Sequence, residues 1–172
     1  LILFAKKNDI LLINDNPYSF ILNDDFVSLL YVNNAKEVAM ELNSLSKSFN
    51  LSGWRVGMLL GSKDNIAKVL KIKSNMDSGM FYGIQKGAIQ ALSLEDSWFN
   101  SLNIKYEKRR KLIWELVTNL GCDFDKNSKG LFVWAKLPEG FKNSEKFIDS
   151  ILKDKKIFIA PGTIFGSEGE GY

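Results

Sequence analysis

Ser44-Leu45-Ser46-Lys47-Ser48-Phe49-Asn50-Leu51-Ser52-Gly53-Trp54-Arg55-Val56-Gly57 is the segment that decides the fold of this chain. It follows an apolar stretch at residues 38–42 and runs into another at 54–60, and both have the length and composition of strands. Lys47 is therefore expected in a Ser- and Asn-rich loop between two strands. An amine among apolar strands, with the cation of Arg55 eight residues on, is disposed to give up its proton and attack a carbonyl carbon. Lys47 is thus a candidate Schiff-base lysine.

A second group of polar residues follows the apolar run at residues 10–13. This run has the length of a strand, and its β-branched ends suit a parallel strand that is buried on both faces. Asp15 and Tyr18 come just past its carboxyl end, at the edge where open α/β sheets bind ligands. A carboxylate and a phenol are therefore expected near the lysine loop.

Three further side chains in the loop suit an anion. The planar guanidinium of Arg55, with the hydroxyls of Ser44 and Ser46, would form a phosphate clamp. Pyridoxal phosphate (PLP) needs a lysine for its aldehyde, a cationic clamp for its phosphate, a carboxylate for its pyridine nitrogen and a hydroxyl donor for its phenolate oxygen. The residues that meet these needs, in the same order, are Lys47, Arg55, Asp15 and Tyr18. The sequence therefore predicts a PLP site.

The rest of the chain alternates helix and strand patterns. In chain order we expect a helix end at 1–7, helices at 63–73 and 84–92 with a loop at 74–79 between them, a long helix at 98–120, a strand at 131–135, a helix at 147–152 and a strand at 157–159. Gly121 suits the end of the long helix, which would join two lobes. Residues 1–96 and 97–172 are the predicted domains.

Composition excludes several classes of function. The chain has 172 residues, 23 basic and 20 acidic side chains, and a net charge of +3, which gives no strong field for nucleic acid or an anionic membrane. Histidine is absent, so imidazole-based mechanisms are excluded within this chain, and no metal site is predicted. The single Cys122, with no secretion signal or apolar membrane span, favours a cytoplasmic location.

Two motifs together resemble a known family. Asp15-Asn16-Pro17-Tyr18 and segment 44–57 are similar to the Asp-x-x-Tyr and Ser-x-Ser-Lys-x(5)-Gly-x-Arg-x-Gly signatures of class I/II aminotransferases, the fold type I PLP enzymes. Later matches occur in the family's order and cover essentially the whole chain: Gln85, Tyr106, Arg109-Arg110, 130–138 and Pro161-Gly162-Thr163-x-Phe165-Gly166. Segments 41–47 and 76–81 look closest to aspartate aminotransferase-like and LL-diaminopimelate aminotransferase-like members.

The resemblance implies a fold and a role for each site residue. The fold would be α/β: the later strands of a mixed large-domain sheet plus most of a small α/β domain. Lys47 would form the Schiff base and move a proton between the substrate α-carbon and the cofactor C4′. Asp15 would hold the pyridinium, Tyr18 would donate to the phenolate oxygen, and Arg55 with the Ser44 and Ser46 hydroxyls would bind phosphate. The implied substrates are an amino acid and a 2-oxo acid, and the implied assembly is a homodimer.

Other family features have no counterpart in this sequence. These are a Gly-containing phosphate turn, a ring-stacking aromatic and an Asn upstream of Asp-x-x-Tyr, and a carboxylate-binding arginine downstream of 169–172. The chain opens without Met and ends in a Gly-rich segment. We therefore interpret it as a piece of a longer protein that holds about half of an active site and is inactive alone.

Several alternatives stay open at this point. The same anchoring residues would serve a PLP-dependent β-eliminating lyase, a non-catalytic sensor domain of a regulator, or a piece that folds without binding anything. Ser44-x-x-Lys47 also matches the serine motif of penicillin-binding proteins. The companion Ser-Asp-Asn and Lys-Thr-Gly motifs are absent, however, and we expect the lysine between strands rather than in an opening helix.

Overall fold

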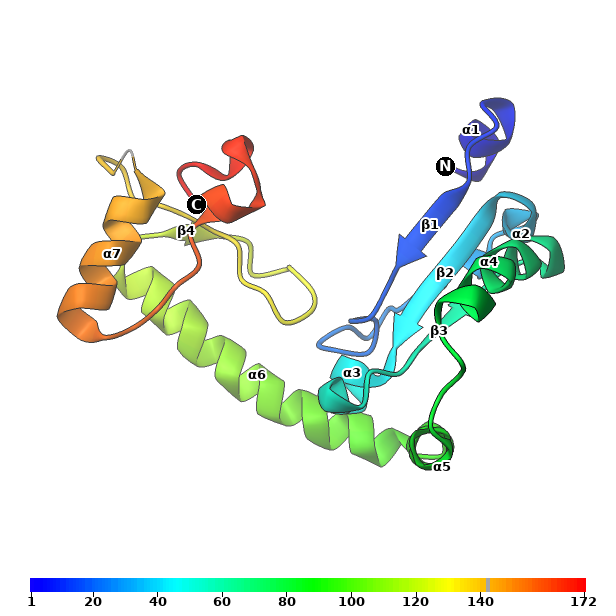
Figure 1. The fold of residues 1–172 in the computed structure, drawn as a ribbon. Helices are drawn as coiled ribbons and strands as arrows, with labels where there is room; N and C mark the ends of the chain where they lie inside the picture. Colours follow the sequence, from blue (N-terminus) through cyan, green and yellow to red (C-terminus); the bar gives the residue numbers. More distant parts are fainter. Residues whose placement is uncertain (142) are drawn as a thin grey trace. The chain divides into compact units, whose positions relative to one another are not determined.

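The computed structural model describes residues 1–141 and 143–172. It divides into two compact units, Leu1–Ile104 and Lys105–Tyr172. Helices and strands alternate along both, which confirms the predicted α/β class (Figure 1). The predicted domain boundary between residues 96 and 97 stays a prediction about the domains of a longer protein. Within the described ranges, every helix is too short or too polar to cross a lipid bilayer.

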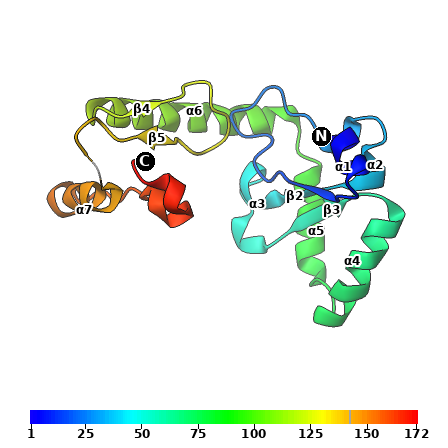
Figure 2. The same cartoon turned by 90° about the horizontal axis from the view of Figure 1, so that it is seen from above.

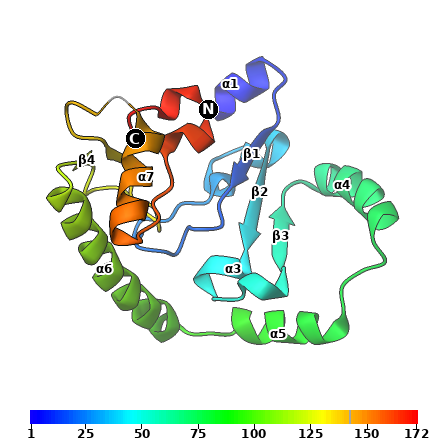
Figure 3. The same ribbon diagram turned by 60° about the vertical axis from the view of Figure 1, so that its left-hand side comes forward.

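The first unit contains a mixed three-stranded sheet. Its strands are β1 (Leu12–Asp15), β2 (Ala39–Ser44) and β3 (Gly57–Leu60), and they lie side by side in the order β1-β2-β3 (Figure 3). β1 is parallel to β2, and β3 is antiparallel to β2. The carboxyl ends of β1 and β2 and the amino end of β3 therefore share one edge of the sheet. The mixed sheet agrees with the predicted fold.

The first strand differs from its prediction in position and in burial. β1 begins two residues later than the apolar run at 10–13. The prediction that this strand is buried on both faces is wrong, since Ile13 is 59 % exposed. The described residues pack only one face of β1, and Ile13 lies on the other face. The packed face carries Leu12, which packs against a buried cluster made of Ile2, Ala35 and Ala39.

The elements around the sheet form two small cores. Helix α1 (Ile2–Lys7), helix α2 (Ala35–Val38) and the 3-10 turn η1 (Leu29–Tyr31) enclose the first, and α1 shows that residues 2–7 are helical, as expected for 1–7. The second core joins Leu45, Val56 and Ala91, so that it packs the segment between β2 and β3 against helix α5 (Tyr82–Leu92). The lysine segment is thus held by a core of its own.

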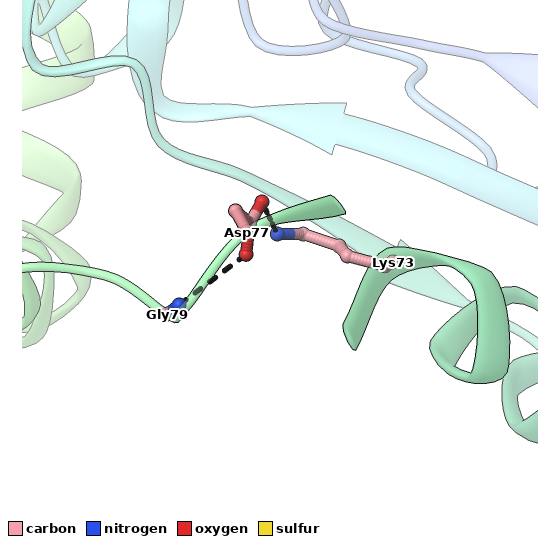
Figure 4. A network of polar contacts seen from close by, with 3 residues as sticks. All are labelled: Lys73, Asp77 and Gly79. Carbon is pink, nitrogen blue, oxygen red and sulfur yellow. Dashed lines mark hydrogen bonds and ion pairs between the residues drawn. The ribbon is translucent and has the colours of Figure 1, made fainter. Parts of the chain in front are cut away.

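Helix α4 (Lys63–Met76) is capped by Ser62, whose hydroxyl accepts a hydrogen bond from Asn65 N. The helix ends at Met76, so the first three residues of the loop expected at 74–79 are helical. After its end, the Asp77 carboxylate accepts hydrogen bonds from Lys73 Nζ and from Gly79 N (Figure 4). The hydrogen bond from Lys73 is the main reason that the pKa of Asp77 lies below its ordinary value. This contact closes the turn between α4 and α5.

The second unit contains the later part of the 24-residue helix α6 (Asp96–Asn119), the two-stranded sheet β4 (Asp123–Phe124) with β5 (Ala135–Lys136), and helix α7 (Ser144–Lys155) (Figure 2). As predicted, Gly121 follows the long helix and has a left-handed φ of 75°. The Trp114 and Phe124 rings, 6.2 Å apart, pack β4 against α6.

Two predicted strands are wrong in this unit. The strand at 131–135 is reduced to Ala135–Lys136, because β4 offers only two residues for pairing, and residues 157–159 find no strand partner among the described residues.

Residues 161–172, which we call the terminal loop, are hydrogen-bonded to one another and to Leu137, the residue after β5. The loop holds two 3-10 turns, η3 (Gly162–Phe165) and η4 (Ser167–Gly169). Gly162 N donates to Tyr172 O at 2.9 Å, and Leu137 N donates to Gly171 O at 2.8 Å. Gly162 and Gly169 approach so closely that a Cβ on either would overlap the carbonyl oxygen of the other. Both glycines are buried.

A carboxylate ties the terminal loop to the first residue of α7. Glu170 Oε1 accepts hydrogen bonds from Ser144 N at 2.7 Å and from Ser144 Oγ at 2.9 Å, and Ser144 is fully buried. The backbone N–H of Ser144 is the main reason that the pKa of Glu170 lies below its ordinary value. The negative charge also suits the positive end of the α7 dipole.

We expect the folding stability of Glu170→Gln to change less with pH in the acidic range than that of the wild type. Because the pKa of Glu170 is lower in the folded chain, its carboxylate stabilises the fold above the ordinary pKa of glutamate. That stabilisation is lost as the pH falls through the folded-state pKa. Wild-type urea midpoints should therefore decrease more steeply than those of Glu170→Gln as the pH is lowered below about 5.

The matched control is Glu168→Gln in the same loop, because Glu168 accepts no hydrogen bond from the described residues. It should keep the wild-type dependence on pH. Equal slopes for the wild type and Glu170→Gln would contradict a role for the charge of Glu170.

Candidate functional site

Three of the predicted site residues lie at one edge of the three-stranded sheet. Asp15 is the last residue of β1, Ser44 is the last residue of β2, and Arg55 lies two residues before β3. Since neighbouring strands are ~4.8 Å apart, the three strand ends span only ~10 Å. The mixed topology therefore brings residues 40 positions apart in sequence to one region the size of a small molecule.

Lys47 lies in a one-turn helix, α3 (Leu45–Ser48), that extends from the end of β2 (Figure 1). Ser44 caps this helix, since its hydroxyl accepts a hydrogen bond from Ser46 N at 3.1 Å. The prediction of a loop without helix is wrong here: the serine cap and the burial of Leu45 favour the turn. The helix removes one argument against a penicillin-binding serine motif. The companion Ser-Asp-Asn and Lys-Thr-Gly motifs are still absent from the sequence, which argues against that alternative.

The structure brings Lys47 and Tyr18 together. Lys47 Nζ lies 5.8 Å from the centroid of the Tyr18 ring, and both side chains are half-buried. Tyr18 belongs to a turn after β1 in which Ile21 N donates to Tyr18 O at 2.9 Å. The amine and the phenol therefore lie on adjacent segments at the same sheet edge.

The residues of the predicted phosphate clamp are only partly assembled. Ser44 Oγ lies 2.9 Å from Ser46 Oγ and 3.2 Å from Val56 O, so the two hydroxyls form a pair. Arg55 is exposed, has a left-handed φ of 55°, and donates from Nη1 to Ser52 O at 3.0 Å. Its described hydrogen bond thus goes to its own turn and not to the serines. A guanidinium has five N–H donors, so this bond leaves donors for an anion.

Two polar residues that the sequence analysis did not single out support the sheet edge. Asn43 Oδ1 accepts from Ser44 N at 2.7 Å. The buried Glu41 accepts at Oε2 from Ser28 Oγ at 2.8 Å and from Leu29 N at 2.9 Å. Alternation along β2 places both on one face. The partners of Glu41 lie 12 and 13 positions away in sequence, so no local pattern indicates its role.

A hollow of about 520 Å³ on the first unit also borders β2 and includes Glu41, Asn43, Phe49 and Met58 in its lining. None of the six predicted site residues lines it. This hollow is therefore separate from the predicted site, which is defined by the strand ends and by the Lys47–Tyr18 contact. In the described ranges there is no cluster of three or more His, Cys, Asp or Glu side chains suited to a metal ion.

Comparison with known proteins assigns the chain to a family. Residues 1–171 match the model for aminotransferase class I and II. The chain belongs to this family. The matching relatives include LL-diaminopimelate aminotransferase of Gloeobacter violaceus, 40 % identical over 171 residues, and that of Halothermothrix orenii, 41 % identical over 174 residues. The alignments cover 98 % and 100 % of this chain, and 44 % of each relative.

Solved aminotransferase structures share the fold. An aminotransferase from Staphylococcus aureus superposes with a TM-score of 0.89 and 33 % sequence identity, over 99 % of this chain and 46 % of the other. The chain thus spans less than half the length of the aminotransferases that it matches. Class I and II aminotransferases depend on PLP, so the resemblance expected from the Asp-x-x-Tyr and lysine motifs is confirmed at the level of family, fold and cofactor class.

Proposed function

We propose that this aminotransferase chain supplies the lysine-bearing part of a PLP site that moves an amino group from an amino acid to a 2-oxo acid. The observation that carries the proposal is the contact of Lys47 Nζ with the Tyr18 ring, beside the strand ends of Asp15 and Ser44. The donor set fits PLP, because a carboxylate, an amine, a phenol and paired hydroxyls lie within a few strand widths. The names of the matching relatives support amino-group transfer over β-elimination.

PLP, when bound, supplies an aldehyde that combines with amines and a ring that withdraws electrons. The amine of Lys47 would condense with the aldehyde carbon with loss of water. After the substrate amine replaces it there, Lys47 would carry a proton between the substrate α-carbon and the cofactor C4′. The Asp15 carboxylate would keep a proton on the pyridine nitrogen, and the Tyr18 hydroxyl would donate to the phenolate oxygen. Half-burial of Lys47 and Tyr18 limits the access of water to both groups.

Phosphate would be bound by the Ser44 and Ser46 hydroxyls and by Arg55. The two hydroxyls already lie 2.9 Å apart at the start of α3. Arg55 would turn from Ser52 O toward the phosphate, which is a stronger, charge-assisted partner. Its exposed side chain has room for this change.

The substrate and the setting are further parts of the proposal. The names of the relatives make LL-diaminopimelate the amino donor to test first, with a 2-oxo acid as acceptor. The family resemblance supports a homodimer. The unpaired thiol of Cys122 supports a reducing compartment, the cytoplasm.

Reductive trapping tests the site. The chain is incubated with PLP, treated with borohydride and digested, and the pyridoxyl group is located by mass spectrometry. We expect one dominant adduct, on Lys47. We also expect less labelling by pyridoxal, because it lacks the phosphate that Arg55 and the serines would bind. Labelling spread over exposed lysines such as Lys36 and Lys68, equal for the two compounds, would contradict the proposal.

A further inference from the structure

The first part of α6, at Trp98, Phe99 and Asn103, contacts both segments that carry the site residues, although none of the three residues belongs to the motifs. Asn103 contacts the segment that follows Tyr18. Its Oδ1 accepts from Leu22 N at 2.9 Å, and its Nδ2 donates to Phe20 O at 3.0 Å. Both ends of the amide are therefore used to hold backbone about 80 positions away in sequence. All these residues lie in the first unit.

Trp98 contacts the segment that carries Lys47. Its Nε1 donates to Ser48 O at 3.1 Å, and Ser48 is the residue that follows Lys47. Ser48 is almost completely buried, so its carbonyl group has little access to solvent. A hydrogen bond from Trp98 therefore fixes the end of the one-turn helix α3.

Phe99 connects the two segments. Its ring centroid lies 5.4 Å from that of Phe20 and 5.4 Å from that of Phe49. Phe20 is two residues beyond Tyr18, and Phe49 is two residues beyond Lys47. The start of α6 thus contacts residues 20–22, which follow Tyr18, and residues 48–49, which follow Lys47. It makes hydrogen bonds to each segment, and the Phe99 ring packs against both.

We propose that Trp98, Phe99 and Asn103 are positioning residues that set the place of the Tyr18 phenol relative to the Lys47 amine. Their chemical purpose rests on the proposed function, since they act on the PLP site through Tyr18 and Lys47. Their mechanical role does not depend on PLP. A shift of either segment would change the 5.8 Å approach of Lys47 Nζ to the Tyr18 ring.

The test uses two variants that release one segment each. Asn103→Leu keeps the approximate shape of the side chain but removes both hydrogen bonds to residues 20 and 22. Trp98→Phe keeps an aromatic ring but removes the Nε1 donor to Ser48 O. The matched control is Asn100→Leu, because Asn100 lies on the same helix, is exposed and makes no described side-chain hydrogen bond.

Hydrogen exchange without PLP is the first measurement. We expect faster exchange at residues 20–22 in Asn103→Leu and at residues 48–50 in Trp98→Phe, with the wild-type pattern in Asn100→Leu. Faster exchange throughout the unit in both variants, or none in either, would overturn the positioning role. If one variant fails to fold, the other still tests the segment that it releases.

Binding of PLP is the second measurement. Asn103→Leu and Trp98→Phe should each lower the affinity for PLP by up to about tenfold, because each removes one or two part-buried hydrogen bonds that hold a segment of the site. Each should also shift the pH at which the absorption of bound PLP changes, because the phenol and the amine are displaced. Asn103→Gln, which keeps both amide functions, should restore part of the affinity. Local exchange changes with unaltered PLP affinity and titration would overturn the link to the site, whereas a wild-type chain that does not bind PLP would contradict the proposed function instead.

Discussion

Replacing Lys47 by arginine is expected to reduce borohydride trapping of PLP to the background level. Arginine keeps the positive charge and much of the length of the side chain, but its guanidinium does not lose a proton in proteins and so cannot bond to the aldehyde carbon. Noncovalent binding should persist at lower affinity, since Asp15, Ser44 and Arg55 are unchanged. Intact-mass measurement of the reduced protein gives the fraction that is labelled.

The control for Lys47→Arg is Lys68→Arg, which changes an exposed lysine on α4 and should label as the wild type does. Circular dichroism of both variants establishes that the fold is kept. Undiminished labelling of Lys47→Arg would show that another amine carries the adduct and that Lys47 is not the catalytic lysine.

Gly162→Ala is expected to destabilise the terminal loop by about 1–3 kcal/mol or more, as overpacked sites do. The added Cβ would overlap Gly169 O, which is a backbone atom and cannot move aside as a flexible side chain would. The hydrogen bonds Gly162 N to Tyr172 O and Leu137 N to Gly171 O should open. Exchange of those two amides, measured by NMR, should be about tenfold to a hundredfold faster than in the wild type.

The matched control is Gly53→Ala, because a Cβ at Gly53 meets no atom within 4 Å. It should leave exchange at Gly162 and Leu137 unchanged. Gly169→Ala should act like Gly162→Ala, because the overlap is mutual. Wild-type exchange in both loop variants would mean that the two backbones are not in tight contact in solution.

Helices and motifs that rely on nearby residues were predictable from the sequence. α4, α5 and α6 follow from the 3.6-residue spacing of apolar side chains, and Gly121 correctly indicates the end of α6. The edge shared by Asp15, Ser44 and Arg55 follows from strand order, because residues at strand ends meet when the strands are neighbours.

The errors occur where distant partners decide the structure. An apolar stretch such as 157–159 has the composition of a strand, but a strand also needs a partner, and composition does not specify one. The contacts of Asn103 with residues 20 and 22 are invisible for the same reason. Arg55 shows a third limit, since motif spacing places its backbone but not the direction of its guanidinium.

Because β3 pairs antiparallel to β2, the number of residues between these two strands affects where the site residues lie. Ser44 is paired with Gly57, and Leu45 N donates to Val56 O at 3.0 Å, so the segment between them is closed at its base like a hairpin. The closed segment consists of α3 and a turn that ends at Arg55 in a left-handed conformation, so one residue inserted or deleted within it would change where Lys47 and Arg55 lie relative to the paired base. Engineering of this protein could therefore vary side chains within the closed segment more freely than the number of residues that it contains.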